Sequence, residues 1–405
     1  MDQSTPFNDR LVLAPTHDHM ADKYDDLDTE FEPQLFSSLE RHLPQHLLDV
    51  SRDTKHERMQ QILRRYSTKE ECHRRQGLEK CRQKIASDYQ RIFRDPYTLN
   101  PEVFFQPTFL EAFRAKGKNL ETSIRSIMSE PVPGVYTFNM LNLNFCEKLI
   151  HEVKHFEAWA HNTDSSILRP NTGNGYGVSL DDIGMKATLD KLMEDYISLI
   201  SRVLFPDVGG CSLDSRHGYV LQYGKDKAIE EDLHVDDSEV TLHVCLGNQF
   251  AGGELVFGGQ RCKDHVNDGT HIEKEFDYLL PVGGQAIIHR GCRRYGAKPI
   301  KFGHRYNFLM WFKSSVFREL QTHDKGFKDF CDECQSLKIA RRNEWVAAKK
   351  KVEEMLLLES LSKDYYESCL FSPCCFMVLM LFVIMMECCL LASKTGFSVL
   401  FCSRF

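Results

Sequence analysis

The sequence predicts an α+β protein in which an antiparallel barrel or jelly roll follows a helical N-terminal region. Residues 240–246 alternate Val or Leu with Thr, His or Cys, and this period of two is typical of a half-buried strand. Glycine pairs or polar loops separate further short apolar runs, and no helical pattern intervenes. Such strands favour an antiparallel barrel or jelly roll over a doubly wound parallel sheet. The further runs are residues 219–223, 254–257, 276–280, 285–289 and 305–312.

Outside the strand region, apolar residues at helical spacing predict helices. Two prolines and a glycine at Pro131-Val132-Pro133-Gly134 indicate a boundary between the two kinds of structure. The helical patterns cover residues 51–95, 144–159, 185–204 and 335–363. We therefore expect an acidic and basic helical region at 1–130, a domain at 131–318 with its strand core at 215–313, a charged helical extension at 319–368, and a hydrophobic, cysteine-rich tail at 369–405.

Composition and charge exclude several classes of protein. The 405 residues are 42% hydrophobic, which is enough for a sizeable core and excludes wholesale disorder. The 51 Lys and Arg residues against 58 Asp and Glu give a net charge of −7, so no nucleic-acid partner is expected. Residues 21–40 carry seven acids and one Lys, whereas residues 51–95 carry 13 Lys or Arg and seven acids. We interpret the basic stretch as a solvated helix face or a partner of the acidic stretch.

The cysteine pattern indicates a reducing compartment. Nine of the 15 cysteines are scattered before residue 369, mostly singly and in apolar runs, as free core thiols are. The first residues carry no basic segment followed by an apolar one, so we expect no signal peptide and a cytoplasmic or nuclear location. Cys331-Asp332-Glu333-Cys334 has the spacing of half a zinc knuckle, but no second pair follows at the usual distance. Free thiols are the favoured interpretation, and zinc is the alternative.

The tail contains an uncharged run of 18 residues, from Cys369 to Met386. This length falls within the range of about 17–25 residues that can cross a bilayer. One interpretation is a transmembrane helix that anchors the tail in a membrane. The other is a C-terminus produced by unusual splicing or gene modelling.

Two elements of the strand region carry candidate chemistry. His234-Val235-Asp236 follows an apolar strand, and an imidazole and a carboxylate at this spacing supply two ligands of the facial triad for non-haem Fe(II). The structural alternative is a surface loop with a local hydrogen bond. Arg305 enters a strong apolar strand, where an arginine is costly unless its planar fork meets an anion such as a carboxylate. The alternative here is an arginine that caps the strand at the surface.

These elements, with the turn Gly252-Gly253-Glu254-Leu255, resemble the prolyl 4-hydroxylase-like Fe(II)/2-oxoglutarate-dependent dioxygenases. The sequence is similar in particular to the plant members of the 2-oxoglutarate and iron-dependent oxygenase domain-containing proteins. The resemblance implies a double-stranded β-helix (jelly-roll) core with an N-terminal helical region and a C-terminal helix. It implies His234 and Asp236 as iron ligands, Arg305 as the partner of the 2-oxoglutarate C5 carboxylate, and Tyr223 as a neighbour of that cosubstrate. No catalytic residue is expected beyond the metal site.

The chain departs from the family pattern at the distal metal ligand. The resemblance implies a histidine ten residues before Arg305, where this sequence has Tyr295. A phenolate favours Fe(III), whereas the chemistry requires Fe(II). His289 would serve as third ligand only after a loop shift, and a site with two protein ligands and waters is a further alternative. A second departure is His243, where the resemblance implies Asn.

We therefore expect an oxidoreductase, a dioxygenase that uses Fe(II), 2-oxoglutarate and O₂, with ascorbate as reductant. The resemblance implies hydroxylation of a prolyl or lysyl side chain of a protein, with decarboxylation of 2-oxoglutarate to succinate. The substrate protein itself is not identified by any residue. The alternative is a catalytically impaired binding protein of the same fold, which has lost iron because of Tyr295. A membrane-tethered scaffold is a third hypothesis.

Overall fold

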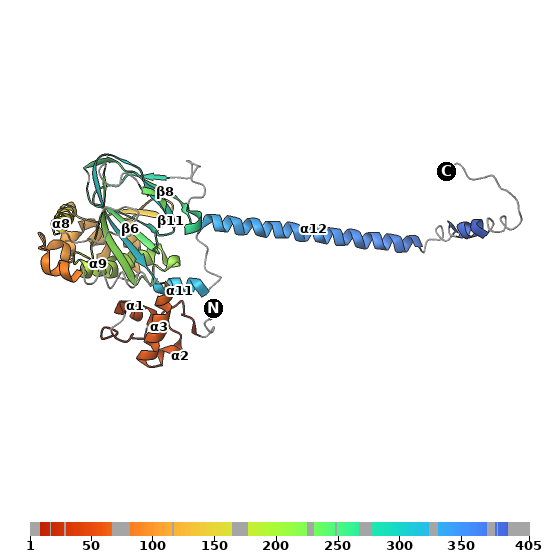
Figure 1. Cartoon of the computed structure of the whole chain (residues 1–405), viewed down its shortest axis with the longest axis horizontal. Coiled ribbons are helices and arrows are strands. Elements are labelled where there is room, and N and C mark those ends of the chain that lie inside the picture. Colours follow the sequence, from red (N-terminus) through yellow and green to blue (C-terminus); the bar gives the residue numbers. More distant parts are fainter. Residues whose placement is uncertain are drawn as a thin grey trace. The chain divides into compact units, whose positions relative to one another are not determined.

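The computed structural model of the chain (Figure 1) divides into two compact units, residues 1–334 and 335–405. The first unit contains both β-sheets and all the candidate oxygenase residues. The four-part division expected from the sequence stays a prediction. The structure describes residues 9–16, 18–27, 30–66, 82–115, 117–163, 177–224, 231–247, 249–266, 277–323, 331–370, 377–378 and 380–387.

The N-terminal residues form a helical layer with its own apolar core. Phe36, Leu39, Met59 and Ile62, which lie at helical spacing, pack together and against Val316 of a helix that follows the strand region. This packing holds the N-terminal layer to the end of the strand region. The helices concerned are α1 (Pro33–Glu40), α2 (Gln45–Leu48), α3 (Arg52–Tyr66) and α11 (Ser315–His323).

Ion pairs join the acidic stretch to the basic helix α3, as one of the two interpretations of its charge predicted. Lys55 Nζ lies 2.6 Å from a carboxylate oxygen of Asp22 and 2.6 Å from one of Glu40. Arg52 pairs with Asp26 at 2.8 Å. Both Lys55 and Glu40 are buried, so removing either one would take a charged partner from a buried ion of the opposite sign.

The helix predicted over residues 51–95 is present at 52–66 and 82–88 but ends before residue 95. The backbone N–H groups of Ile92 and Phe93 donate to the carboxylate of the buried Glu152 at 3.2 and 3.0 Å. Donors turned toward a side chain do not make helical hydrogen bonds, so the helical pattern ends before this point. Residues 67–81, in the middle of the predicted helix, lie outside the described part of the chain.

The larger sheet, counted over the described residues, has eight antiparallel strands in the order β1-β2-β10-β6-β12-β4-β3, with β7 paired to β12 (Figure 1). The long central strand β12 pairs with β4 on one side, where Arg305 is opposite Tyr223. On the other side it pairs with β6, where Leu309 is opposite His243. The strands are β1 (Ser129–Val132), β2 (Val135–Asn139), β3 (Gly177–Ser179), β4 (Ser215–Gly224), β6 (Val240–Cys245), β7 (Phe250–Gly252), β10 (Gln285–Arg290) and β12 (Ile300–Lys313).

Helices cover the outer face of this sheet. Val240, Leu242 and Val244 of β6 point into the main apolar core, together with Phe145 and Phe156 of the long helix α8. The helices and helical turns of this layer are η2 (Asp95–Tyr97), α5 (Pro101–Phe104), α6 (Pro107–Arg114), α7 (Lys118–Ser126), α8 (Leu143–Asn162), α9 (Lys186–Leu192), the π-helical turn η3 (Met193–Ile197), α10 (Ser198–Leu204) and η4 (Pro206–Val208).

A second antiparallel sheet, with the order β5-β11-β8-β9, covers the inner face. Phe257 and Tyr295 of this sheet share an apolar cluster with Val135 and Ile287 of the larger one. Strand β6 is therefore buried on both faces, and the prediction that it is half-buried was wrong. The candidate site lies between the sheets. The strands are β5 (Glu231–His234), β8 (Leu255–Gln260), β9 (Asp277–Leu279) and β11 (Arg293–Ala297), and the turn η5 (Lys263–His265) follows β8.

The C-terminal part is helical, as predicted. Helix α12 (Asp332–Leu370) begins in the first unit and continues into the second. Among the described residues, no helix combines the length and the apolarity needed to cross a membrane. Residues 371–376 and 379 of the uncharged run lie outside the described part of the chain.

Candidate metal and cosubstrate site

His234 and Asp236 lie side by side at the end of β5. Nε2 of His234 is 3.6 Å from Oδ1 of Asp236, whose side chain is fully buried. Nδ1 of His234 is 2.8 Å from the carbonyl oxygen of Asp232. Because a carbonyl only accepts, Nδ1 carries the proton and Nε2 carries the lone pair. Metal-ligating histidines are commonly held in this way by a backbone carbonyl, so the pair fits two ligands of Fe(II).

The Asp236 carboxylate also accepts hydrogen bonds from two hydroxyl groups. Thr241 donates to Oδ2 at 2.6 Å. Tyr295, which is paired with His234 in the β5–β11 register, lies 3.2 and 3.3 Å from the two carboxylate oxygens. The ring of Tyr295 is 4.3 Å from that of His234. The structure thus brings Tyr295 to His234 and Asp236, with its hydroxyl directed at the carboxylate.

His289 and His243 form a buried pair beside Tyr295. Their Nε2 atoms are 3.0 Å apart, and Nδ1 of His289 is 2.8 Å from the carbonyl oxygen of Arg290. Burial lowers the pKa of His289 to about 4. Burial, and then repulsion by the neighbouring His289, lowers the pKa of His243 well below its usual range. Both imidazoles are therefore neutral, and His243 donates to the Nε2 lone pair of His289, because Nδ1 of His289 carries its proton.

His289 lies on β10, with its ring centroid 5.0 Å from that of Tyr295. Its service as a third ligand after a loop shift stays a prediction. Its Nε2 lone pair is nevertheless occupied by the hydrogen bond from His243. His289 would have to give up this bond to bind a metal.

The Arg305 side chain is fully buried, and only part of its guanidinium group is hydrogen-bonded. Its guanidinium lies over the ring of Tyr223, with Cζ 4.3 Å from the ring centroid, and its Nη1 donates to the carbonyl oxygen of Gly253. Nε and Nη2 have no hydrogen-bond partner among the residues that the structure describes. Buried donors are almost always paired, so these two N–H groups fit a carboxylate bound in the bidentate manner. The surface-cap alternative for Arg305 is wrong.

The glycine turn before β8 lets the backbone reach Arg305. Gly253 has φ of 71°, a region that favours glycine. A Cβ here would lie 2.3 Å from Cδ1 of Ile300 and 3.2 Å from Nη1 of Arg305. The Gly-Gly pair recognised in the sequence is therefore needed for this approach of the chain to the arginine.

Sequence reasoning missed two polar residues of this interior. Thr241 binds Asp236, and Asn307 is buried with its Oδ1 unpartnered, two residues after Arg305 and on the same face of β12. Both follow from the period of two: Thr241 is two residues before His243, and Asn307 two residues after Arg305. The period of two therefore indicates not only the strands but also which polar side chains share a face with His243 and Arg305.

Comparisons with known proteins found relatives that cover most of the chain. A family model, the OGFOD2-like domain, matches residues 85–210. The Arabidopsis thaliana 2-oxoglutarate and iron-dependent oxygenase domain-containing protein CP2 is 49% identical over 325 residues, 80% of this chain and 82% of the relative. Protein ICU11 of the same description and organism is 45% identical over 363 residues, 88% of this chain and 90% of the relative. A solved prolyl hydroxylase from Trichoplax adhaerens, in complex with a hypoxia inducible factor peptide fragment, is 15% identical with a TM-score of 0.36, and the match covers 56% of this chain and 99% of that one.

Proposed function

This chain belongs to the family of 2-oxoglutarate and iron-dependent oxygenase domain-containing proteins, and on that premise we propose that it is an Fe(II)- and 2-oxoglutarate-dependent dioxygenase with a double-stranded β-helix core. The observation that carries the proposal is Arg305, a buried guanidinium with two unpartnered N–H groups on the inner face of β12. A buried cation with open donors is strongly disfavoured unless an anion is bound there. The C5 carboxylate of 2-oxoglutarate supplies such an anion, and the ring of Tyr223 packs against the guanidinium in a cation–π contact.

The metal would be held by His234 and Asp236, with a third position filled from outside the protein. Support comes from the tautomer of His234 and from the 3.6 Å between its Nε2 and Oδ1 of Asp236. In this proposal Tyr295 is a hydrogen-bond donor to Asp236 and is not a ligand. Bound Fe(II) would supply the activation of O₂ that hydroxylates a C–H bond while 2-oxoglutarate is decarboxylated to succinate, with ascorbate as reductant.

The protein's own residues perform binding, orientation and exclusion of water. Arg305 and Tyr223 fix the far end of the cosubstrate, so that its keto acid end points toward His234 and Asp236. Thr241 holds the carboxylate of Asp236 in place. The apolar cluster between the sheets, which includes Phe257, keeps bulk water from the reacting atoms. For the substrate we propose a prolyl or lysyl side chain of a protein, on the strength of the prolyl 4-hydroxylase-like resemblance.

One observation favours a second candidate function, a binding protein of this fold without iron. The Tyr295 hydroxyl lies within hydrogen-bond distance of both oxygens of Asp236, the atoms on which a metal would depend. In that case Arg305 would still bind a dicarboxylate, and the protein would bind 2-oxoglutarate without catalysing an oxidation.

Anaerobic titration of the full chain with Fe(II) and 2-oxoglutarate distinguishes the two candidates. The visible charge-transfer band of the chelate is expected to appear and saturate in the wild type, and to be lost in Arg305→Ala. Arg290→Ala is the matched control, because Arg290 lies on the neighbouring strand β10 and pairs with Asp207 instead; its band should be unchanged. A band absent from the wild type but present in Tyr295→His would support the binding protein. No band in either protein, with 2-oxoglutarate binding also absent by calorimetry, would contradict both.

With a working site, substrate class is tested by turnover. Succinate formation is measured with peptides that present proline or lysine, and the products are examined for the added mass of one oxygen atom. Hydroxylation of neither residue, alongside succinate release with some other class of compound, would contradict the proposed substrate class and leave the oxygenase proposal standing.

A further inference from the structure

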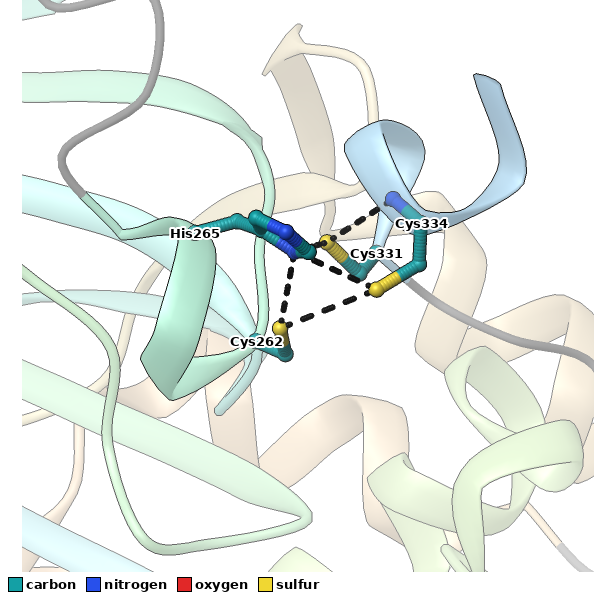
Figure 2. A group of neighbouring side chains, drawn as sticks. All are labelled: Cys262, His265, Cys331 and Cys334. Carbon is teal, nitrogen blue, oxygen red and sulfur yellow. Dashed lines mark hydrogen bonds between the residues drawn. The ribbon is translucent and has the colours of Figure 1, made fainter. Parts of the chain in front are cut away.

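Four metal-binding side chains meet at a place remote in sequence from the oxygenase residues. Cys262 directly precedes the turn η5 after β8 and His265 is the last residue of that turn, whereas Cys331 precedes α12 and Cys334 lies in its first turn. His265 and Cys331 are 66 residues apart in the sequence. Figure 2 shows the three sulfur atoms and Nδ1 of His265 directed at one another. The four ligand atoms all lie within 4.8 Å of one another.

No second pair follows Cys331-x-x-Cys334 at the usual distance, but one precedes it. Cys262-Lys263-Asp264-His265 is a Cys-x-x-His pair, with the same spacing of two intervening residues. The fold brings the two pairs together although His265 and Cys331 are 66 residues apart.

Hydrogen bonding alone does not explain the convergence. Sγ of Cys262 and Sγ of Cys334 are each 3.2 Å from Nδ1 of His265, and Sγ of Cys331 is 3.5 Å from it. Nδ1 carries either one hydrogen or one lone pair, so it can satisfy one of these three sulfur atoms and not all of them. Thiols are also weak donors and acceptors, which gives them little reason to gather around one nitrogen.

The distances match a tetrahedral metal site. Zn–S bonds of about 2.3 Å and Zn–N bonds of about 2.0–2.1 Å give tetrahedral edges of roughly 3.8 Å between sulfur atoms and roughly 3.6 Å between sulfur and nitrogen. The Sγ atoms of Cys262 and Cys334 are 3.8 Å apart, and the three sulfur–nitrogen distances are at most 0.4 Å shorter than the ideal edge. The 3.8 Å separation is far longer than a disulfide bond of about 2.05 Å.

We propose that Cys262, His265, Cys331 and Cys334 bind one structural Zn²⁺ ion. Three thiolates and an imidazole are a ligand set that selects zinc, and four protein ligands leave no position open for a substrate. The backbone N–H of Cys334 is directed at Sγ of Cys331 at 3.5 Å, which is a common way of supporting a metal-bound sulfur. Free thiols that bind zinc also agree with a reducing compartment.

The zinc ion ties the β8 end of the smaller sheet to the first turn of α12. The same two segments are joined by an ion pair of 2.9 Å between Arg261 and Asp332 and by a hydrogen bond of 2.9 Å from the backbone N–H of Gln260 to Asp332. Because the Asp332 side chain of this pair is exposed, the ion pair alone contributes little. A four-ligand metal site contributes far more, because metal binding requires the folded arrangement.

Metal analysis of the full chain, purified under reducing conditions without added zinc, tests the proposal. One zinc per chain is expected, and it should be lost in Cys262→Ser and in Cys334→Ser. Cys292→Ser is the matched control: Cys292 is a half-buried thiol near Gln260 that lies outside the cluster, so its zinc should remain. The double variant His234→Ala, Asp236→Ala should also keep its zinc, which separates this ion from one bound at the oxygenase site.

Two further measurements keep the test decisive if a serine variant does not fold. His265→Cys retains four ligands and should retain zinc. In the wild type, alkylation of Cys262, Cys331 and Cys334 should be slow until a strong chelator is added, whereas that of the exposed Cys211 should not change. Wild-type protein without zinc, zinc that disappears with His234 and Asp236 rather than with the cysteines, or alkylation that is indifferent to the chelator would each overturn the proposal.

Discussion

The role of Tyr295 can be decided by removing one oxygen atom. If its hydroxyl is a hydrogen-bond donor to Asp236, the variant Tyr295→Phe removes a competitor for the carboxylate lone pairs, and Fe(II) should bind more tightly. A hydrogen bond to a charged group contributes about 1.5–3 kcal/mol. The distances of 3.2 and 3.3 Å are long for an O–H···O bond, so the lower end applies. We therefore expect Fe(II) to bind about tenfold more tightly, the equivalent of about 1.4 kcal/mol.

The assay is an anaerobic Fe(II) titration at saturating 2-oxoglutarate, in competition with a chelator of known affinity. Tyr219→Phe is the matched control, since it removes a buried phenol hydroxyl from strand β4 and leaves both Tyr223 and Arg305 in place. Its Fe(II) affinity should equal that of the wild type. A second readout is exposure to air, because a tyrosine ligand gives the ferric protein a phenolate-to-iron absorption band. Weaker Fe(II) binding in Tyr295→Phe, or such a band in the wild type, would refute the reasoning and make Tyr295 a ligand.

The remaining predictions concern buried carboxylates that hold the helical layers. Glu40→Gln should lower the free energy of unfolding by about 2 kcal/mol, because Lys55 and Tyr24 lose their charged hydrogen-bond partner and Lys55 keeps only Asp22; chemical denaturation would report the change. Burial acts to raise the pKa of Glu40, but hydrogen bonds from Lys55, Tyr24 and His19 lower it overall. Its contribution is therefore full above its ordinary pKa of 4.5 and is lost as the pH falls, so wild type and variant should converge in acid. Glu152→Gln should cost about 2 kcal/mol and speed hydrogen exchange at Ile92 and Phe93; unchanged exchange would contradict it.

The sequence predicted the places of the candidate oxygenase residues better than it predicted their contacts. His234, Asp236 and Arg305 were singled out because each motif is local or follows the strand period. Asp236 and Arg305 are buried and His234 lies beside Asp236, while their roles stay predictions. The pairing of His289 with His243 was not predictable, because it depends on the register between β10 and β6. Register follows from hydrogen bonds between strands that are far apart in sequence.

The same reasoning explains the long helix and the metal cluster. Local periodicity predicts a helix through residue 95, but the carboxylate of Glu152, more than 50 residues later, captures the backbone donors of Ile92 and Phe93. Likewise Cys331-x-x-Cys334 looked incomplete, because its partner pair is a sequence-remote turn. In both cases a long-range polar contact overrides a correct local pattern.

Loss of zinc should affect the smaller sheet more than the larger one, so the zinc proposal and the oxygenase proposal can be tested separately. Arg305 and Tyr223 lie on β12 and β4 of the larger sheet, whereas His234 and Tyr295 lie on β5 and β11 of the smaller one. Strand β11 pairs with β8, and β8 leads into the turn that carries two of the zinc ligands. Loosening that turn in Cys334→Ser should therefore weaken Fe(II) binding while 2-oxoglutarate binding, measured by calorimetry without metal, stays near wild type. Equal loss of both affinities would mean that the variant unfolds both sheets, and loss of neither would mean that the zinc does not support the smaller sheet.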